Sequence, residues 1–199
     1  MTKRIDYFLA LQSPWTYLGH ERLQSAADRH GAEIMVYPVD FARIFAETGG
    51  LPLPQRPPAR RAYRMAELRR WRDFLNLPMV LEPKFFPTAP QPATGMVIAA
   101  REAGHDAMAL AGAVLRAVWA EEQDTSDPAV LAKLAGGLGL DGEALIAESQ
   151  SAETNTQLSE DTDQAITAGV FGAPSYVFRG ELYWGQDRLE FLDRALARD

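Results

Sequence analysis

The stretch LQSPWTYLG, residues 11–19, links a short apolar segment to a segment with helical spacing. The apolar segment, residues 5–9, predicts a buried strand. Pro14 suits the first turn of a helix, because its missing N–H would have no partner there. We therefore predict a strand, a turn and a helix that ends near Gly31, a residue typical of C-caps. Residues 33–39 predict a second strand, which completes a right-handed βαβ unit.

Ser13 stands just before the predicted helix, where backbone N–H groups lack partners and the helix dipole favours an anion such as a thiolate. Its hydroxyl is able to donate a hydrogen bond to a thiolate sulfur and hold the pKa of that thiol below its ordinary value of about 8.5. The alternative is that Ser13 serves only as an N-cap. Thr16, one turn deeper, is expected to be a packed helix residue and not a second catalytic group.

The composition excludes several classes of partner. The chain has 199 residues, enough for a sizeable core, and 47% of them are hydrophobic, unlike a disordered chain. A net charge of -7 offers no basic surface for nucleic acid or an anionic membrane. The sequence has no apolar run long enough to span a membrane, and its first residues lack the features of a signal peptide. We expect a cytoplasmic protein that acts on a small organic molecule.

The chain contains no cysteine, which excludes disulfides, thiolate metal sites, cysteine nucleophiles and dithiol chemistry by the protein itself. Any thiol chemistry must therefore use a thiol from another molecule. The histidines His20, His30 and His105 lie far apart and show no metal-ligand spacing. We expect no metal site.

The middle of the chain is predicted to be helical. A proline-rich loop, residues 49–61, leads into a helix whose many charged residues, in 59–73, are most often a solvated face. A second loop covers residues 83–92. Further helical segments are predicted over residues 93–103, 105–122, 128–138, 142–150 and 151–168.

The last part of the chain returns to β-strand patterning. Residues 175–178 and 181–184 predict a hairpin. Asp187 and Glu190 have capping-box spacing and predict a terminal helix capped by Asp187. The order βαβ, helices, ββα indicates an α/β, thioredoxin-like sheet domain with a large all-helical insertion. The expected boundaries are 1–42 with 169–199 for the discontinuous sheet domain, and 43–168 for the insertion.

Two further stretches suit a peptide-like ligand. In GVFGAPSYV, residues 169–177, a cis Ala173-Pro174 bond would leave the backbone of Ala173 free to pair with an extended ligand above the first helix. The alternative is an ordinary trans proline that starts an edge strand. At the predicted start of the last helix, Asp187 and Arg188 suit the ammonium and carboxylate of an amino acid, or they only cap the helix.

The sequence resembles the DsbA-like thioredoxin superfamily and, within it, the 2-hydroxychromene-2-carboxylate isomerases and the kappa-class glutathione transferases. The resemblance spans nearly the whole chain. It rests on SPWTYLG, on TGG-P-RPP-Y-ELRRW, on WAEEQDTSDPAVL, and most specifically on GVFGAPSYV followed by WGQDRLEFL. Redox members have CPWCY where this chain has SPWTY, residues 13–17, so dithiol exchange is excluded.

The resemblance implies a glutathione site. In the family, the serine at the position of Ser13 faces the glutathione sulfur, which implies a catalytic role for Ser13. Tyr17 and Trp184 are expected to border the substrate cleft. The cofactor-binding residues implied by the family are Gly172, Ala173, Pro174, Gln186, Asp187 and Arg188. Ala173 and Pro174 are implied for the cysteinyl part, with Gly172 in the loop leading there, and the last three for the γ-glutamyl end.

The chain also departs from the family pattern. Isomerases often have an asparagine where Gly50 stands, a lysine where Arg60 or Arg61 stands, and an aspartate where Glu67 stands. Arginine keeps the positive charge of lysine but not its shape. We expect Arg60 or Arg61 to hold the substrate carboxylate, while the identity of the substrate stays open.

The resemblance implies a glutathione-dependent isomerase that interconverts 2-hydroxychromene-2-carboxylate and trans-o-hydroxybenzylidenepyruvate, or a close analogue, in aromatic catabolism. Thiolate addition, bond rotation and elimination would regenerate glutathione, which is then a cofactor. Two alternatives are a kappa-class-like glutathione transferase and a non-catalytic thioredoxin-like binding module. Members of the family are commonly dimers, so a homodimer is expected.

Overall fold

The computed structural model describes residues 2–198 and contains a four-stranded mixed sheet. Its strands are β1 (Lys3–Leu9), β2 (Ala32–Pro38), β3 (Ser175–Phe178) and β4 (Glu181–Trp184). The spatial order is β2-β1-β3-β4, with β1 parallel to β2 and antiparallel to β3. The helix α1 (Pro14–His30) joins the two parallel strands and ends at Gly31 in the left-handed conformation. The predicted βαβ start, the hairpin and the thioredoxin-like fold class are confirmed.

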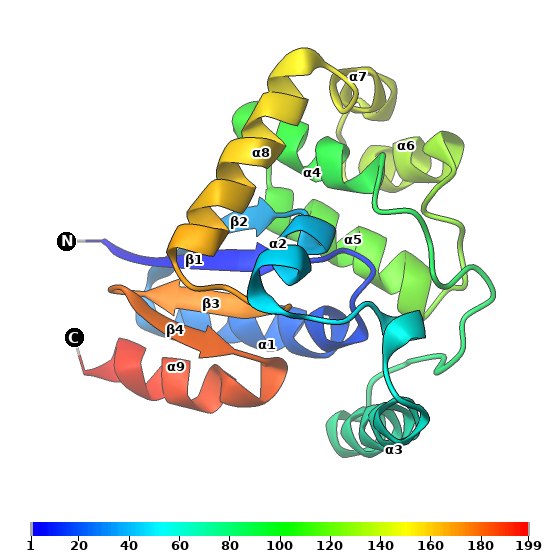
Figure 1. The fold of residues 1–199 in the computed structure, drawn as a ribbon. Coiled ribbons are helices and arrows are strands. Elements are labelled where there is room, and N and C mark those ends of the chain that lie inside the picture. Colours follow the sequence, from blue (N-terminus) through cyan, green and yellow to red (C-terminus); the bar gives the residue numbers. More distant parts are fainter. Residues whose placement is uncertain (1, 199) are drawn as a thin grey trace.

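The core lies on both faces of the sheet because side chains of a strand alternate between faces. Ile5 and Tyr7 of β1 belong to a buried cluster with residues of α1 and of the terminal helix α9 (Leu189–Ala197). Phe8, on the opposite face of the sheet, joins a second cluster with residues of α2 (Phe41–Thr48) and α8 (Ala152–Thr167). Figure 1 shows α2 and α8 in front of the sheet and α1 behind it.

The middle of the chain is helical, as predicted. The helices are α3 (Pro58–Leu75), α4 (Ala93–Glu102), α5 (Ala107–Trp119), α6 (Pro128–Gly137) and α7 (Gly142–Glu148). Residues of α4 and α5 share one buried cluster with β1. The boundaries of the sheet domain and of the helical insertion stay a prediction. Within the described residues, no helix is both long and apolar enough to cross a membrane.

Two helix boundaries differ from the prediction. The loop expected over residues 49–61 contains a short 3₁₀ turn, Leu53–Gln55, and ends early, because α3 already begins at Pro58. Proline is tolerated at the first position of a helix, so the proline-rich composition of this segment did not exclude a helix start at Pro58. The short helix α2 was not predicted, although Asp40 caps it by accepting from the N–H of Ala42 at 2.8 Å.

The prediction that Asp187 caps the last helix is wrong. A 3₁₀ turn, Gln186–Arg188, precedes α9, and neither this turn nor α9 has a side-chain cap. The tighter turn follows from Gly185, whose φ of 98° favours glycine. The carboxylate of Asp187 instead accepts a hydrogen bond from the guanidinium of Arg188 at 2.8 Å.

Helix α1 packs very closely on β3 and on the turn before α9. At Gly19, a Cβ atom would lie 2.8 Å from the hydroxyl oxygen of Tyr176 and 2.9 Å from Cβ of Gln186. Tyr176 is fully buried and its ring stacks on Tyr7 at 5.4 Å between centroids, so it has little room to move. Glycine is therefore required at position 19 by packing and not by its backbone angles.

Substitution of this glycine tests the close contact. Alanine normally stabilises a helix by about 1 kcal/mol relative to glycine. We expect Gly19→Ala to lower the free energy of unfolding instead, by about 1–3 kcal/mol, because the new methyl group overpacks the contact. Urea denaturation measures whether the free energy of unfolding falls or rises. Gly136→Ala in α6 is the matched control, since a Cβ there meets nothing within 4 Å. A Gly19→Ala protein as stable as the Gly136→Ala protein would contradict the packing.

Candidate active site

Ser13 lies in the turn between the carboxyl end of β1 and the first turn of α1. Its N–H donates to the C=O of Ala10 at 3.0 Å, and its backbone is extended. The N–H of Thr16 donates to Oγ of Ser13 at 3.3 Å, so Ser13 is the N-cap of α1. Because Oγ is the acceptor in this bond, the hydroxyl proton stays available to a ligand. Within residues 2–198 the N–H of Trp15 has no acceptor, which leaves a second donor at the same helix start.

The register of the sheet brings the loop before β3 to the same end of the molecule. Ser175, the first residue of β3, is paired with Phe8 near the carboxyl end of β1, and on its other side with Trp184. The Ala173-Pro174 peptide bond is cis, as the prediction of a ligand-pairing loop required. The backbone N–H and C=O of Ala173 find no hydrogen-bond partner among the described residues. They are thus able to pair with an extended ligand.

An aromatic edge borders this loop. The exposed side chains of Phe171 and Trp184 contact each other, with 4.7 Å between ring centroids. A Cβ at Gly172 would lie 2.4 Å from Nε1 of Trp184, so only glycine lets the indole pack over the loop. The backbone C=O of Gly172 accepts from the hydroxyl of Ser175 at 2.8 Å, which fixes the loop further. The predicted residues Gly172 and Trp184 are therefore in contact.

The turn that follows β4 lies against α1. Gln186 is buried, and both its side-chain and backbone oxygens accept hydrogen bonds from the guanidinium of Arg22 on α1. Asp187 and Arg188 are exposed and form an ion pair with each other. A ligand's charged groups would thus meet a preformed pair. The sequence analysis missed Arg22, because nothing in its local pattern indicates a partner 164 positions away.

The predicted substrate-binding residues are not all brought together. Tyr17 donates its hydroxyl to the C=O of Pro78 at 2.6 Å, and burial together with the charge of Glu21 raises the pKa of its phenol. Arg60 and Arg61 are exposed in the first turn of α3. No hydrogen bond or ion pair within residues 2–198 ties either arginine side chain to the rest of the site. Their role stays a prediction.

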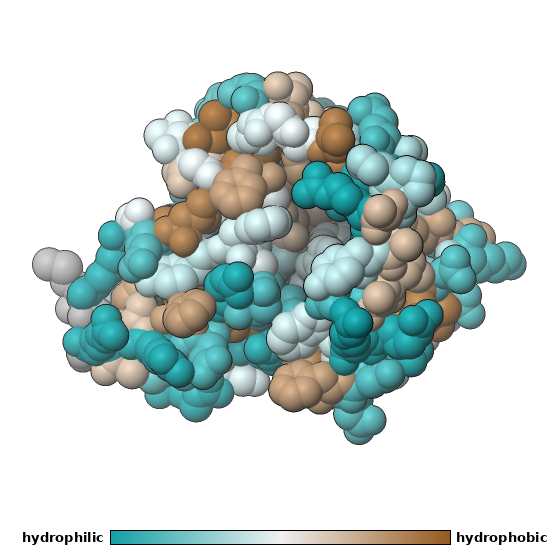
Figure 2. Space-filling view, turned by 60° about the horizontal axis from the view of Figure 1, so that its bottom comes forward, coloured by the Kyte–Doolittle hydropathy of each residue, from teal (hydrophilic) through white to brown (hydrophobic). Residues whose placement is uncertain are grey.

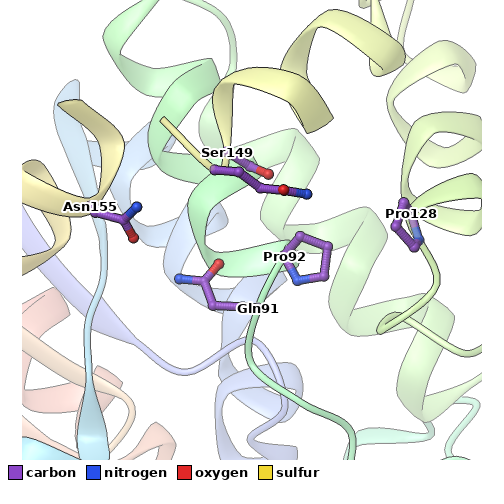
Figure 3. A pocket seen from close by; sticks show the side chains of 6 residues that line it. Gln91, Pro92, Pro128, Ser149 and Asn155 are labelled. Atoms are coloured by element: carbon purple, nitrogen blue, oxygen red, sulfur yellow. The ribbon is translucent and has the colours of Figure 1, made fainter. Parts of the chain in front are cut away.

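A hollow of about 330 Å³ lies away from these residues (Figure 3). It is lined by Gln91, Pro92, Pro128, Ser149, Gln150 and Asn155. Two of its polar groups are already used, since Gln91 accepts from the N–H of Gly95 and Ser149 donates to the C=O of Ile146. We therefore assign no function to it. Figure 2 shows a different face, which is hollowed near its middle and mixes hydrophilic with hydrophobic side chains.

A buried polar chain supports α1 from behind. The hydroxyl of Tyr7 donates to Nδ1 of His20 at 3.2 Å, and Nε2 of His20 donates to the C=O of Met108 at 3.0 Å. The C=O of Met108 can only accept, so Nε2 carries a proton, and in the neutral ring Nδ1 is then the acceptor for Tyr7. Burial lowers the pKa of His20 from 6.5 to about 4, which keeps the ring neutral at pH 7.

This histidine makes stability depend on pH. Between pH 6.5 and 4, the unfolded chain binds a proton at His20 that the folded chain does not bind. The stabilisation is complete above pH 6.5 and falls as the pH is lowered, by about 3 kcal/mol at pH 4. We expect His20→Gln to be less stable at pH 7 and to approach the wild type in stability towards pH 4, as measured by urea unfolding. The exposed His105→Gln is the control. A constant gap between wild type and His20→Gln would refute this.

The DSBA-like thioredoxin domain family matches residues 4–197. The 2-hydroxychromene-2-carboxylate isomerase of Sphingobium xenophagum is 31% identical over 199 residues, which cover 98% of this chain and 99% of that protein. The chain belongs to the DSBA-like thioredoxin family, among relatives of these isomerases. The family resemblance drawn from SPWTYLG, GVFGAPSYV and WGQDRLEFL is confirmed.

Two further relatives are similar to this chain over nearly its whole length. The 2-hydroxychromene-2-carboxylate isomerase of Pseudomonas putida is 28% identical and covers 98% of this chain and 94% of its own length. A solved structure of a 2-hydroxychromene-2-carboxylate isomerase has a TM-score of 0.81 and 28% identity, and the match covers 98% of this chain and 95% of that one. The likeness therefore extends over the sheet and the helical middle alike.

Proposed function

We propose that the protein is a glutathione-dependent isomerase that acts on 2-hydroxychromene-2-carboxylate or a close analogue. The observation that carries this proposal is the hydroxyl cap at Ser13, which lies at the same end of the sheet as the unpaired backbone of Ala173. The curated relatives named as isomerases support the reaction type. A place in the cytoplasm and a homodimer are part of the proposal, by analogy with the family.

The residues present fit a bound glutathione. A chain with no cysteine has no thiol of its own, yet it keeps a helix N-terminus with a free hydroxyl proton and a free N–H at Ser13 and Trp15. Ala173 offers one N–H and one C=O for β-type pairing with the cysteinyl backbone. Asp187 and Arg188 supply both signs of charge for the amino-acid end.

The side chains of this protein have distinct parts in the reaction. Glutathione, when bound, supplies the nucleophilic sulfur whose reversible addition to a conjugated carbon lets a double bond rotate. Ser13 Oγ–H donates to the anionic sulfur and, with the N–H of Trp15, lowers the pKa of the thiol. The loop at Ala173 fixes the ligand's extension, and Gly172 allows Trp184 to cover the loop. Trp184 and Phe171 present an apolar border suited to an aromatic substrate.

Removal of the Ser13 hydroxyl tests the assignment. We expect Ser13→Ala to reduce kcat/KM about tenfold to a hundredfold, because a hydrogen bond to a charged group contributes about 1.5–3 kcal/mol. The pKa of bound glutathione, followed by the ultraviolet absorbance of its thiolate, should rise towards its free value. Isomerisation of the chromene carboxylate is measured with saturating glutathione.

The matched control is Ser151→Ala. Ser151 caps α8 in the same way, because its Oγ accepts from the N–H of Thr154 at 3.0 Å. Both variants lose one helix cap, which costs about 1 kcal/mol of stability. Only Ser13→Ala should lose activity. Equal losses in the two variants would mean that the cap and not the chemistry matters.

The need for glutathione is tested on the wild type. We expect no turnover of the chromene carboxylate in buffer without glutathione, and full turnover without net consumption when it is added. Stable conjugate accumulating in place of the isomer would indicate a transferase. Full activity without glutathione would overturn the proposed function.

A further inference from the structure

Arg64 is a half-buried arginine on α3 that the sequence analysis did not single out. Its guanidinium carbon lies 5.7 Å from the centroid of the Phe86 ring, and its Nη1 lies 3.6 Å from Sδ of Met65. No carboxylate pairs with it within residues 2–198. Burial and the charge of Arg56 lower its pKa to about 10. A cation is thus held against apolar groups without a counter-ion.

Arg56, close to Arg64, is a second half-buried arginine without a carboxylate partner among the described residues. Its Nε donates to the C=O of Leu51 at 2.8 Å. Burial and then the charge of Arg60 lower its pKa. Arg56 therefore lies near two other positive charges, those of Arg64 and Arg60. Such a cluster is unfavourable without an anion, because desolvation of an unpaired charge and like-charge repulsion act in the same direction.

A paired arginine elsewhere in the fold shows the contrast. Arg101 on α4 is also half-buried and also lies over an aromatic ring, that of Tyr37, at 4.9 Å. It donates to the carboxylate of Asp161 at 2.8 Å and to the C=O of Val36 at 2.9 Å. The protein thus supplies a carboxylate to the half-buried Arg101, and it supplies the two oxygens of Gln186 to the half-buried Arg22. At Arg64 the carboxylate is missing.

The neighbours of Arg64 connect it to the candidate active site. Met65 and Phe86 belong to one apolar cluster with Trp15 and Leu68. Trp15 lies in the first turn of α1, two positions after Ser13. Apolar and aromatic side chains of one cluster therefore lie both at the helix start and beside the unpaired guanidinium. An aromatic ring with a carboxylate at one end matches this arrangement, because the planar guanidinium binds carboxylate in a bidentate manner.

We propose that Arg64, with Arg56 beside it, binds the carboxylate of the aromatic substrate, whose apolar part lies against Met65 and Phe86. This inference rests on the proposed function and deepens it. It replaces the expectation that Arg60 or Arg61 holds that carboxylate, since both side chains are exposed whereas Arg64 is half-buried. Glutathione also carries carboxylates, so the test must separate the two sources.

The first arm uses an unreactive probe and needs no catalysis. Calorimetry compares trans-cinnamate with its neutral amide on the intact protein. We expect the wild type to bind cinnamate more tightly than the amide. Arg64→Met should weaken cinnamate binding about tenfold to a hundredfold and leave the affinity for the amide unchanged. Arg69→Met, the same change at an exposed arginine of α3, is the control and should bind both as the wild type does. Equal binding of acid and amide by the wild type would overturn the proposal.

The second arm identifies the source of the carboxylate. We expect Arg64→Met to raise the KM for the chromene carboxylate and to leave the dissociation constant of glutathione unchanged. The KM of Arg64→Lys should lie between those of the wild type and Arg64→Met. Weaker glutathione binding, or a loss in Arg60→Met and Arg61→Met but not in Arg64→Met, would overturn the assignment. The melting temperature of Arg64→Met should not fall, because an unpaired charge is removed. If the wild type shows no turnover, the proposed function fails, while the cinnamate arm still decides the role of Arg64.

Discussion

The hydrogen bond from the N–H of Thr16 to Oγ of Ser13 fixes where the chain leaves the sheet and begins α1. The bond itself contributes about 1 kcal/mol, so its importance is one of position. Because β1 ends four residues earlier and β3 runs antiparallel to it, the loop before β3 must lie at the same end of the sheet. Because β4 pairs with β3, Trp184 lies there as well. One turn thus determines which residues share the candidate site.

A second constraint holds this arrangement rigid. Gly19 lets α1 approach Tyr176 and Gln186 closely, and Arg22 on the same helix binds both oxygens of Gln186. The turn carrying Asp187 and Arg188 is therefore attached to the helix that carries Ser13. A ligand that spans both ends meets groups placed by a strand, a helix and a buried amide, and not by a free loop. Preorganisation of this kind favours binding, because less conformational entropy is lost.

Local signals explain how much of the fold the sequence could predict. Pro14 and Gly31 mark the ends of α1, and two short strand segments joined by the turn Arg179-Gly180 define the hairpin, because each signal acts within a few residues. The prediction that Asp187 caps the last helix was wrong, because aspartate is common both at helix caps and in turns. Gly185, with its positive φ, favours the turn. The roles of Arg22 and Arg64 were not predicted, for a different reason. Their surroundings come from distant segments, and a lone arginine in a basic helix is usually solvated. The glutathione roles came from family resemblance and stay proposals.

The two hydroxyl residues of SPWT differ in what they are able to do. Thr16 is fully buried, and its Oγ1 has no hydrogen-bond partner among the described residues. A buried hydroxyl without a partner is unfavourable and cannot reach a ligand, so the second position of the motif is inert. Ser13 is half-buried and keeps a proton to donate. A pair of cysteines at these positions would be able to form a disulfide with each other while reducing a substrate disulfide, whereas a single accessible hydroxyl is able only to donate a hydrogen bond to an external sulfur. The motif therefore offers no pair of groups for dithiol exchange, and its one accessible hydroxyl is the group that the proposed function assigns to an external sulfur.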